Sequence, residues 1–139
     1  MMSLYRRDFL DWTQSETEKL RTERLGELDL ANLAEEIESL GKQQRATLIN
    51  RLSVLLLHLL KRDFQPERHG RSWELTMAEQ RVRIRQLLKV NPRLLPLRPE
   101  AFLDAYESAR IRAARETKVD LDRIPEICPS SVNDLQLDS

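Results

Sequence analysis

The clearest pattern in the chain is a run of leucines, with one isoleucine, that recurs at helical spacing. Its members are Leu33, Ile37, Leu40, Leu48, Leu52, Leu55 and Leu59. At about 100° per residue these positions lie on one face of an α-helix. The phase is kept across Gly41, so the pattern predicts one long helix over about 30–63, with Asp29 or, alternatively, Asn32 as its N-cap.

Three shorter stretches also repeat at helical spacing. They predict helices over about 4–22, from Ser72 to Asn91, and from Pro99 to about Val119, since proline suits the first turn of a helix. Their expected inner faces are Phe9, Trp12, Glu16 and Leu20; Trp73, Met77, Gln80, Ile84, Leu87 and Leu88; and Phe102, Tyr106, Ala109 and Ala113. The Asp- and Pro-rich residues after Val119 lack this spacing and are expected to form an irregular tail.

No stretch of the chain alternates polar and apolar residues over the length of a strand. The length of 139 residues suits one domain. We therefore expect one all-α domain over 1–139, a helical bundle of about four main helices with an irregular C-terminal tail. Residues 54–60 are apolar almost all round, which indicates the centre of the bundle or, less favoured, a subunit contact.

Charge and composition narrow the class of protein. The chain has 23 basic and 23 acidic residues, which argues against a protein that binds nucleic acid or anionic membranes by bulk charge. The basic residues gather in 61–98, which carries a net charge of +6. The single cysteine, Cys128, excludes an internal disulfide. The sequence shows no membrane span and no signal peptide, so we expect a cytoplasmic protein.

Several polar residues lie along one edge of the apolar face of the long helix: Glu36, Gln44, Arg51, His58 and Arg62. Buried polar groups are costly unless they are paired, so other elements must supply partners. The expected partners are Glu67, Arg68, Arg71, Glu79 and Arg81. Two interpretations remain open: a paired network that fixes helix register, which is favoured, or a ligand or catalytic pocket at the end of the bundle.

Phosphate or RNA chemistry would use these same residues. His58 could act as a base, with Glu36 and Glu79 as further catalytic candidates. Arginine guanidinium groups bind phosphate oxygens, and the candidate binding residues are Arg62, Glu67, Arg68, Arg71, Trp73 and Arg81. No metal site is expected, because paired Glu-x-x-His motifs are lacking. No cofactor is expected, because there is no phosphate-binding glycine loop.

Several short motifs together resemble a known family. They are Tyr5, Asp8-Phe9 and Trp12; Asn32 to Gly41; Leu55 to Lys61; Gln65 to Arg68; Arg71 to Trp73; Glu79 to Arg81; Pro125-Glu126; and Cys128-Pro129. In this combination the chain resembles, over nearly its whole length, the bacterial family number 29 of domains of unknown function. The resemblance implies an all-α bundle in a bacterial cytoplasm and supplies no activity. The chain departs from the family at Arg62, where an aromatic residue is usual.

The leading hypothesis for function is a non-enzymatic helical protein-interaction module. It would bind a protein partner or a second copy of itself through exposed parts of the first and last helices. The alternative is an RNA- or phosphate-directed activity that uses His58 with Arg62, Arg71 and Arg81. A third hypothesis is the neutralising half of a two-gene stress module. A membrane partner is not expected, and nucleic acid is the less favoured partner.

Overall fold

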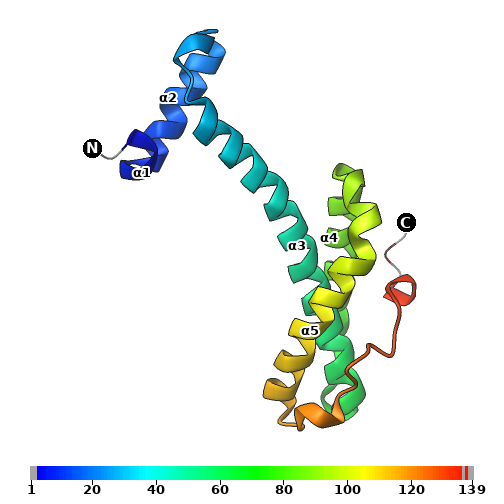
Figure 1. Cartoon of the computed structure of the whole chain (residues 1–139). Coiled ribbons are helices and arrows are strands. Elements are labelled where there is room, and N and C mark those ends of the chain that lie inside the picture. Colours follow the sequence, from blue (N-terminus) through cyan, green and yellow to red (C-terminus); the bar gives the residue numbers. More distant parts are fainter. Residues whose placement is uncertain (1–2, 136, 138–139) are drawn as a thin grey trace. The chain divides into compact units, whose positions relative to one another are not determined.

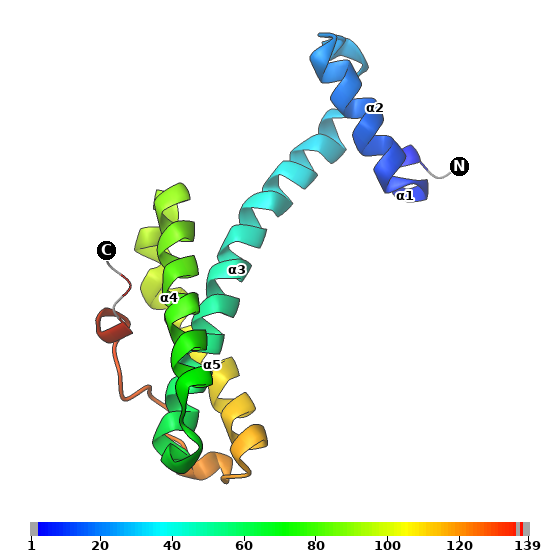
Figure 2. The ribbon, with the colours of Figure 1, turned by 180° about the vertical axis from the view of Figure 1, so that it is seen from behind.

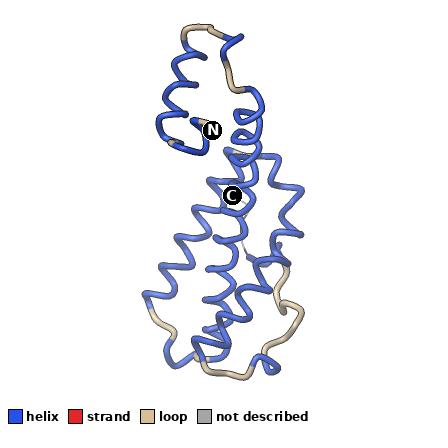
Figure 3. Tube along the Cα trace, turned by 60° about the vertical axis from the view of Figure 1, so that its left-hand side comes forward, coloured by secondary structure: helices blue, strands red, loops and turns tan. Residues whose placement is uncertain are grey.

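The computed structural model describes residues 3–135 and 137, and within these ranges it contains helices and loops but no strand (Figure 3). The main helices are α1 (Leu4–Arg7), α2 (Phe9–Arg21), α3 (Leu30–Phe64), α4 (Arg71–Val90) and α5 (Arg98–Thr117). Short 3₁₀ helices are η1 (Leu25–Glu27), η2 (Pro66–Arg68), η3 (Pro92–Leu97), η4 (Leu121–Arg123) and η5 (Val132–Leu135). The all-α prediction is confirmed. The chain divides into two compact units, Met1–Gln43 and Gln44–Ser139.

The predicted long helix is present as α3, which runs unbroken for 35 residues. The helix passes through Gly41, where an added Cβ would meet no atom within 4 Å. Packing therefore does not require a glycine there. The long helix follows from the leucine phase, which the sequence keeps on both sides of Gly41.

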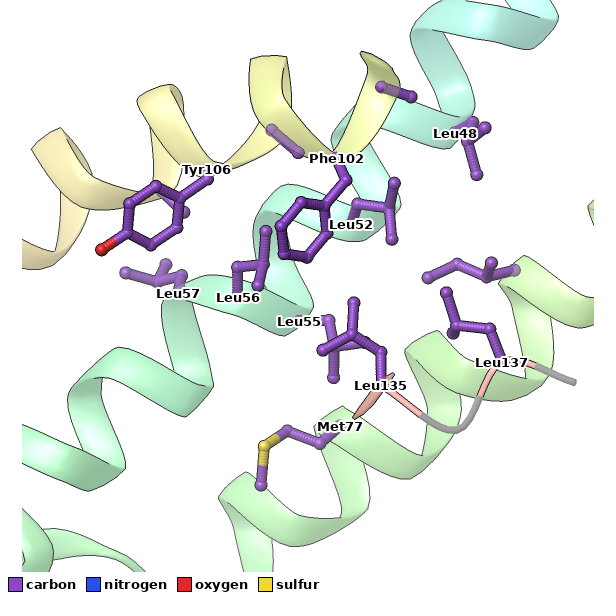
Figure 4. Close-up of a cluster of buried hydrophobic side chains, with 14 of the residues drawn as sticks. Leu48, Leu52, Leu55, Leu56, Leu57, Met77, Phe102, Tyr106, Leu135 and Leu137 are labelled. Atoms are coloured by element: carbon purple, nitrogen blue, oxygen red, sulfur yellow. The ribbon is translucent and has the colours of Figure 1, made fainter. Parts of the chain in front are cut away.

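In the C-terminal unit, α4 and α5 lie along the second half of α3 (Figure 1, Figure 2). Leu48, Leu52 and Leu55 of α3 are fully buried there. They pack in one cluster with Met77 and Ile84 of α4 and with apolar residues of α5 (Figure 4). Four alanines of α5 are fully buried and allow close approach of the neighbouring helix: Ala101, Ala105, Ala109 and Ala113.

The tail packs against this bundle and, as expected, is irregular apart from η4 and η5. Ile124 and Leu135 are buried. The Tyr106 hydroxyl donates to the Pro125 carbonyl at 2.6 Å. The Arg110 guanidinium donates to the carbonyls of Leu121 and Ile124, each at 2.9 Å. The tail is thus held by side chains of the bundle that satisfy its backbone carbonyls.

The prediction of one helix over about 4–22 is wrong in one respect. The helix is interrupted at Asp8, which separates α1 from α2. The backbone of Asp8 is extended, and its carboxylate accepts from the Asp11 backbone N–H at 3.0 Å. Asp8 therefore ends α1 and caps α2. Ser72, which as a serine at a helix start was expected to cap the next helix, lies inside that helix instead, since α4 begins at Arg71 and no side chain caps it.

A small polar network holds α2 to the start of α3 in the N-terminal unit. Trp12 and Glu16 are the buried residues of α2. The Trp12 indole N–H donates to the Asp29 carboxylate at 3.0 Å. The Asp29 backbone N–H donates to Glu16, and Lys19 pairs with Glu16 at 2.9 Å. Hydrogen bonds from Asn32 and from Trp12 lower the pKa of Asp29. Asp29 directly precedes α3, and its carbonyl accepts from the Leu33 backbone N–H at 2.9 Å, as expected for the predicted N-cap, whereas Asn32 lies inside the helix.

The prediction of one buried leucine face along α3 is correct only for its second half. Ile37 is 67% exposed and Leu40 is 60% exposed. Helical phase determines which side chains share a face, but other elements decide whether that face is covered. Within the described N-terminal unit, the apolar face of α3 is left largely open.

Truncating a buried leucine should therefore cost far more than truncating an exposed one on the same helix. Leu52→Ala should lower the free energy of unfolding by about 2–5 kcal/mol, because it leaves a cavity. The matched control Leu40→Ala should lower it by less than about 0.5 kcal/mol. Urea denaturation followed by circular dichroism measures both. Equal losses would contradict the packing described for α3.

The Asp29 network should be sensitive to acid. Its carboxylate form accepts the hydrogen bonds, so its pKa in the folded chain lies below the ordinary value of 3.8. The stabilisation is present above that value and is lost as pH falls through the lower folded-state pKa. The Trp12 indole N–H resonance should follow this titration by NMR. Asp29→Ala should abolish the acid response, whereas Asp11→Ala, at an exposed position on α2, should keep it.

Candidate functional site

Trp73, in the first turn of α4, is surrounded by three basic side chains. The ring centroids of His58 and His69 lie 6.3 and 6.0 Å from it, both in edge-on geometry. The Lys61 ammonium lies over the indole, 4.8 Å from its centroid. This cluster joins the end of α3, the following loop and the start of α4. Since Lys61 occupies one ring face, that face is not open for stacking with a nucleobase.

The two histidines of the cluster use their nitrogens differently. His58 Nδ1 lies 2.9 Å from the Val54 carbonyl, which only accepts, so Nδ1 donates and the neutral ring keeps its lone pair on Nε2. His69 Nε2 lies 2.6 Å from a Glu74 carboxylate oxygen. The Nδ1 atom of His69 is buried and has no hydrogen-bond partner among the described residues. His58 thus has the basic nitrogen required of a general base.

The other predicted catalytic candidates make contacts elsewhere. Glu79 accepts from Arg83 at 2.9 Å, one turn along α4. Glu36 belongs to the N-terminal unit and accepts from the Tyr5 hydroxyl. That hydrogen bond raises the pKa of Tyr5 to about 12, because ionising the phenol would remove its donor proton. Neither carboxylate is thereby placed to orient His58.

The predicted binding residues are also distributed rather than gathered around one ligand. Arg81 donates to the Leu135 carbonyl at 3.0 Å and so holds the tail. Glu67, Arg68 and Arg71 are exposed on η2 and at the start of α4, and Arg62 is half-buried on α3. On the polar edge of α3, Arg51 donates to the buried Gln80 at 3.5 Å. The structure brings His58 and Trp73 together, and these arginines make other contacts or face solvent.

The described residues contain neither a candidate metal site nor a candidate membrane-spanning helix. Within the described residues, no group of three or more His, Cys, Asp or Glu side chains could hold a metal ion. No helix among the same residues is both long and apolar enough to cross a membrane.

A different feature of the molecule is an open apolar stripe on the first part of α3. We call Leu30, Ala34, Ile37 and Gly41 the α3 stripe; all four are exposed. Their spacing of four, three and four residues places them on one face, as in the seam of a helix pair. The small residues Ala34 and Gly41 alternate with the large ones. A second helix could therefore approach the α3 backbone closely.

An apolar groove with cationic residues lies in the C-terminal unit, at the end of α4. We call it the α4 groove; its volume is about 510 Å³, and it is lined by Val82, Arg85, Gln86, Leu88, Lys89, Leu95 and Leu137. Val82 and Leu95 are 42% and 40% exposed. The groove thus offers an apolar surface with Arg85 and Lys89 in its lining.

A second groove, of about 500 Å³, lies between α5 and the tail, and its lining includes Tyr106, Arg110, Ile127 and Cys128. Burial raises the pKa of the Cys128 thiol. A thiol with a raised pKa is a poor nucleophile at neutral pH. Cys128 therefore lines this groove as a packed side chain without an activated thiolate.

Sequence reasoning missed several residues of these surfaces. Lys61, His69 and Glu74 join the Trp73 cluster only because the loop after α3 turns the chain back. The α4 groove needs α4, η3 and Leu137 together, and no local pattern relates these segments. For the α3 stripe, the apolar spacing could be read from the sequence. The sequence did not show that this face would be left exposed in the N-terminal unit.

Comparison with known proteins agrees with the resemblance noted from the motifs. No curated protein and no solved structure matches the chain. The family model described as "Domain of unknown function DUF29" matches residues 4–139. Because this match covers essentially the whole chain, the protein belongs to the DUF29 family of domains of unknown function.

Proposed function

We propose that this protein is a helical interaction module that binds a protein partner through the α3 stripe. The observation that carries the proposal is a contrast along one helix. Eighteen residues make five helical turns, so Leu30 and Leu48 share one direction, and Ile37 and Leu55 share another. Leu30 and Ile37 are 68% and 67% exposed, whereas Leu48 and Leu55 are fully buried.

Covering the stripe would stabilise a complex. Fully burying a leucine or isoleucine side chain contributes about 1.5–3 kcal/mol, and the stripe offers one of each. The alternation with Ala34 and Gly41 would let a partner helix pack at short range. Contiguous exposed apolar surface of this kind commonly marks interaction sites.

Charged residues beside the stripe would select the partner. Glu38 is exposed at the edge of the stripe and pairs with Lys42 at 3.2 Å, and the N-terminal unit as a whole carries an excess of acidic groups. Such charges suppress partners of like sign and favour basic surfaces. The N-terminal residues 1–43 carry 6 basic and 10 acidic groups. The partner surface should therefore be apolar and basic.

The RNA- or phosphate-directed activity stays a prediction. The interaction proposal has the stronger support, because it needs only groups that are already exposed together. A reaction centred on His58 would need a carboxylate or an anion site beside it, and the partners of Glu79 and Arg81 lie elsewhere.

The proposal predicts that Ile37→Asp abolishes association without unfolding the chain, because it places a charge in the seam. Wild-type protein should either sediment above the monomer mass or retain a specific protein in affinity capture from its host lysate. Ile37→Asp should lose that behaviour and keep the helical circular dichroism signal. The matched control is Leu103→Asp, at a position on α5 that is also 67% exposed, and it should keep the association.

The proposal would be overturned if the wild-type protein stays monomeric and captures from the lysate no protein that Ile37→Asp fails to capture. It would also be overturned if both variants lost association equally, since the effect would then not depend on the stripe.

A further inference from the structure

We infer that the partner of the α3 stripe is a second copy of this chain, whose α4 groove receives the stripe. This inference rests on the proposed interaction function and names its partner. The supporting observation is that the α3 stripe and the α4 groove are both apolar and lie in units of opposite charge.

The charges of the two units are opposite. Residues 1–43 have a net charge of −4, and residues 44–139 have a net charge of +4. This asymmetry is hidden in the formal net charge of zero for the whole chain. Opposite fields of this kind steer two copies toward contact between unlike units.

The same complementarity holds at the level of the two surfaces. The stripe presents Ile37 with the exposed Glu38–Lys42 ion pair at its edge, in a unit whose net charge is −4. The groove presents the exposed Val82 and Leu95 with the cationic side chains of Arg85 and Lys89. Aliphatic side chains of the stripe would enter the groove, and Glu38 would lie against its cations.

Pairing of two stripes with each other is disfavoured by charge. Face-to-face packing would bring together two N-terminal units that each carry a net charge of −4. Like charges held together at an interface cost free energy, whereas stripe-to-groove docking replaces that repulsion with attraction. Each copy carries one stripe and one groove, so reciprocal docking would satisfy both in a dimer.

The deciding experiment is complementation between two variants of the full chain, followed by sedimentation velocity. The stripe variant is Ile37→Asp, and the groove variant is Leu95→Asp. Each alone should weaken self-association at least tenfold and sediment near the monomer mass of 16.4 kDa. An equimolar mixture should form a one-to-one complex, because the stripe variant keeps an intact groove and the groove variant keeps an intact stripe.

A second groove variant keeps the test valid if Leu95→Asp loses its helical signal. Lys89→Glu changes an exposed residue and should weaken self-association at least tenfold. Combining it with Glu38→Lys should recover most of the loss, since the pair of charges is reversed. Added salt should weaken the wild-type dimer, because exposed charges are screened.

Each remaining outcome separates this inference from the proposed function. If the groove variants associate like wild type while Ile37→Asp does not, the stripe binds something other than the groove and the second-copy inference is wrong. The same holds if the wild type is monomeric but captures another protein through the stripe. A monomeric wild type that captures nothing through the stripe overturns both proposals.

Discussion

Burial of the leucine face of α3 is the constraint on which the rest of this structure depends. In the second half of the helix, α4, α5 and the tail cover that face, and Leu48, Leu52 and Leu55 are inaccessible to water. Each such side chain contributes a few kcal/mol on burial. The alanines of α5 let that helix pack closely on α3, and Tyr106, Arg81 and Arg110 hold the tail in place by binding its backbone carbonyls. The Trp73 cluster then secures the turn that brings α4 back along α3.

The first part of α3 has the same apolar pattern without the same cover. In the N-terminal unit, α2 contacts α3 through Trp12, Glu16 and Asp29, which is a mainly polar attachment. The stripe formed by Leu30, Ala34, Ile37 and Gly41 is not part of that attachment. Helical phase kept on a face that no described residue of the N-terminal unit covers is what the proposed intermolecular contact would use, and the opposite charges of the two units favour a copy of the same chain.

How much the sequence could predict differs between these features. The extent of α3 followed from leucine spacing, and the inner faces of α4 and α5 followed from Met77, Ile84, Phe102 and Tyr106. The break at Asp8 was missed because a short polar residue suits both a helix surface and a cap, and its extended backbone decides between them. The exposure of Ile37 was missed because periodicity reports which residues share a face and not what lies opposite.

The candidate site was less predictable than the fold. His58 and Trp73 could each be singled out, but their contact depends on the turn between α3 and α4. The orientations of Glu36 and Glu79 depend on the partner that each carboxylate binds, namely Tyr5 for Glu36 and Arg83 for Glu79. These are tertiary or competing local contacts, and residue type alone does not rank them.

Hydrogen exchange along α3, measured on the full chain from dilute to concentrated solution, tests the central claim most directly. Backbone amides are protected according to the local free energy of opening. The account predicts strong protection over residues 48–60 at every concentration, and weak protection over residues 30–41 that rises as the protein is concentrated. Strong and uniform protection from residue 30 to residue 60 in the most dilute sample would contradict it, since the stripe would then already be covered.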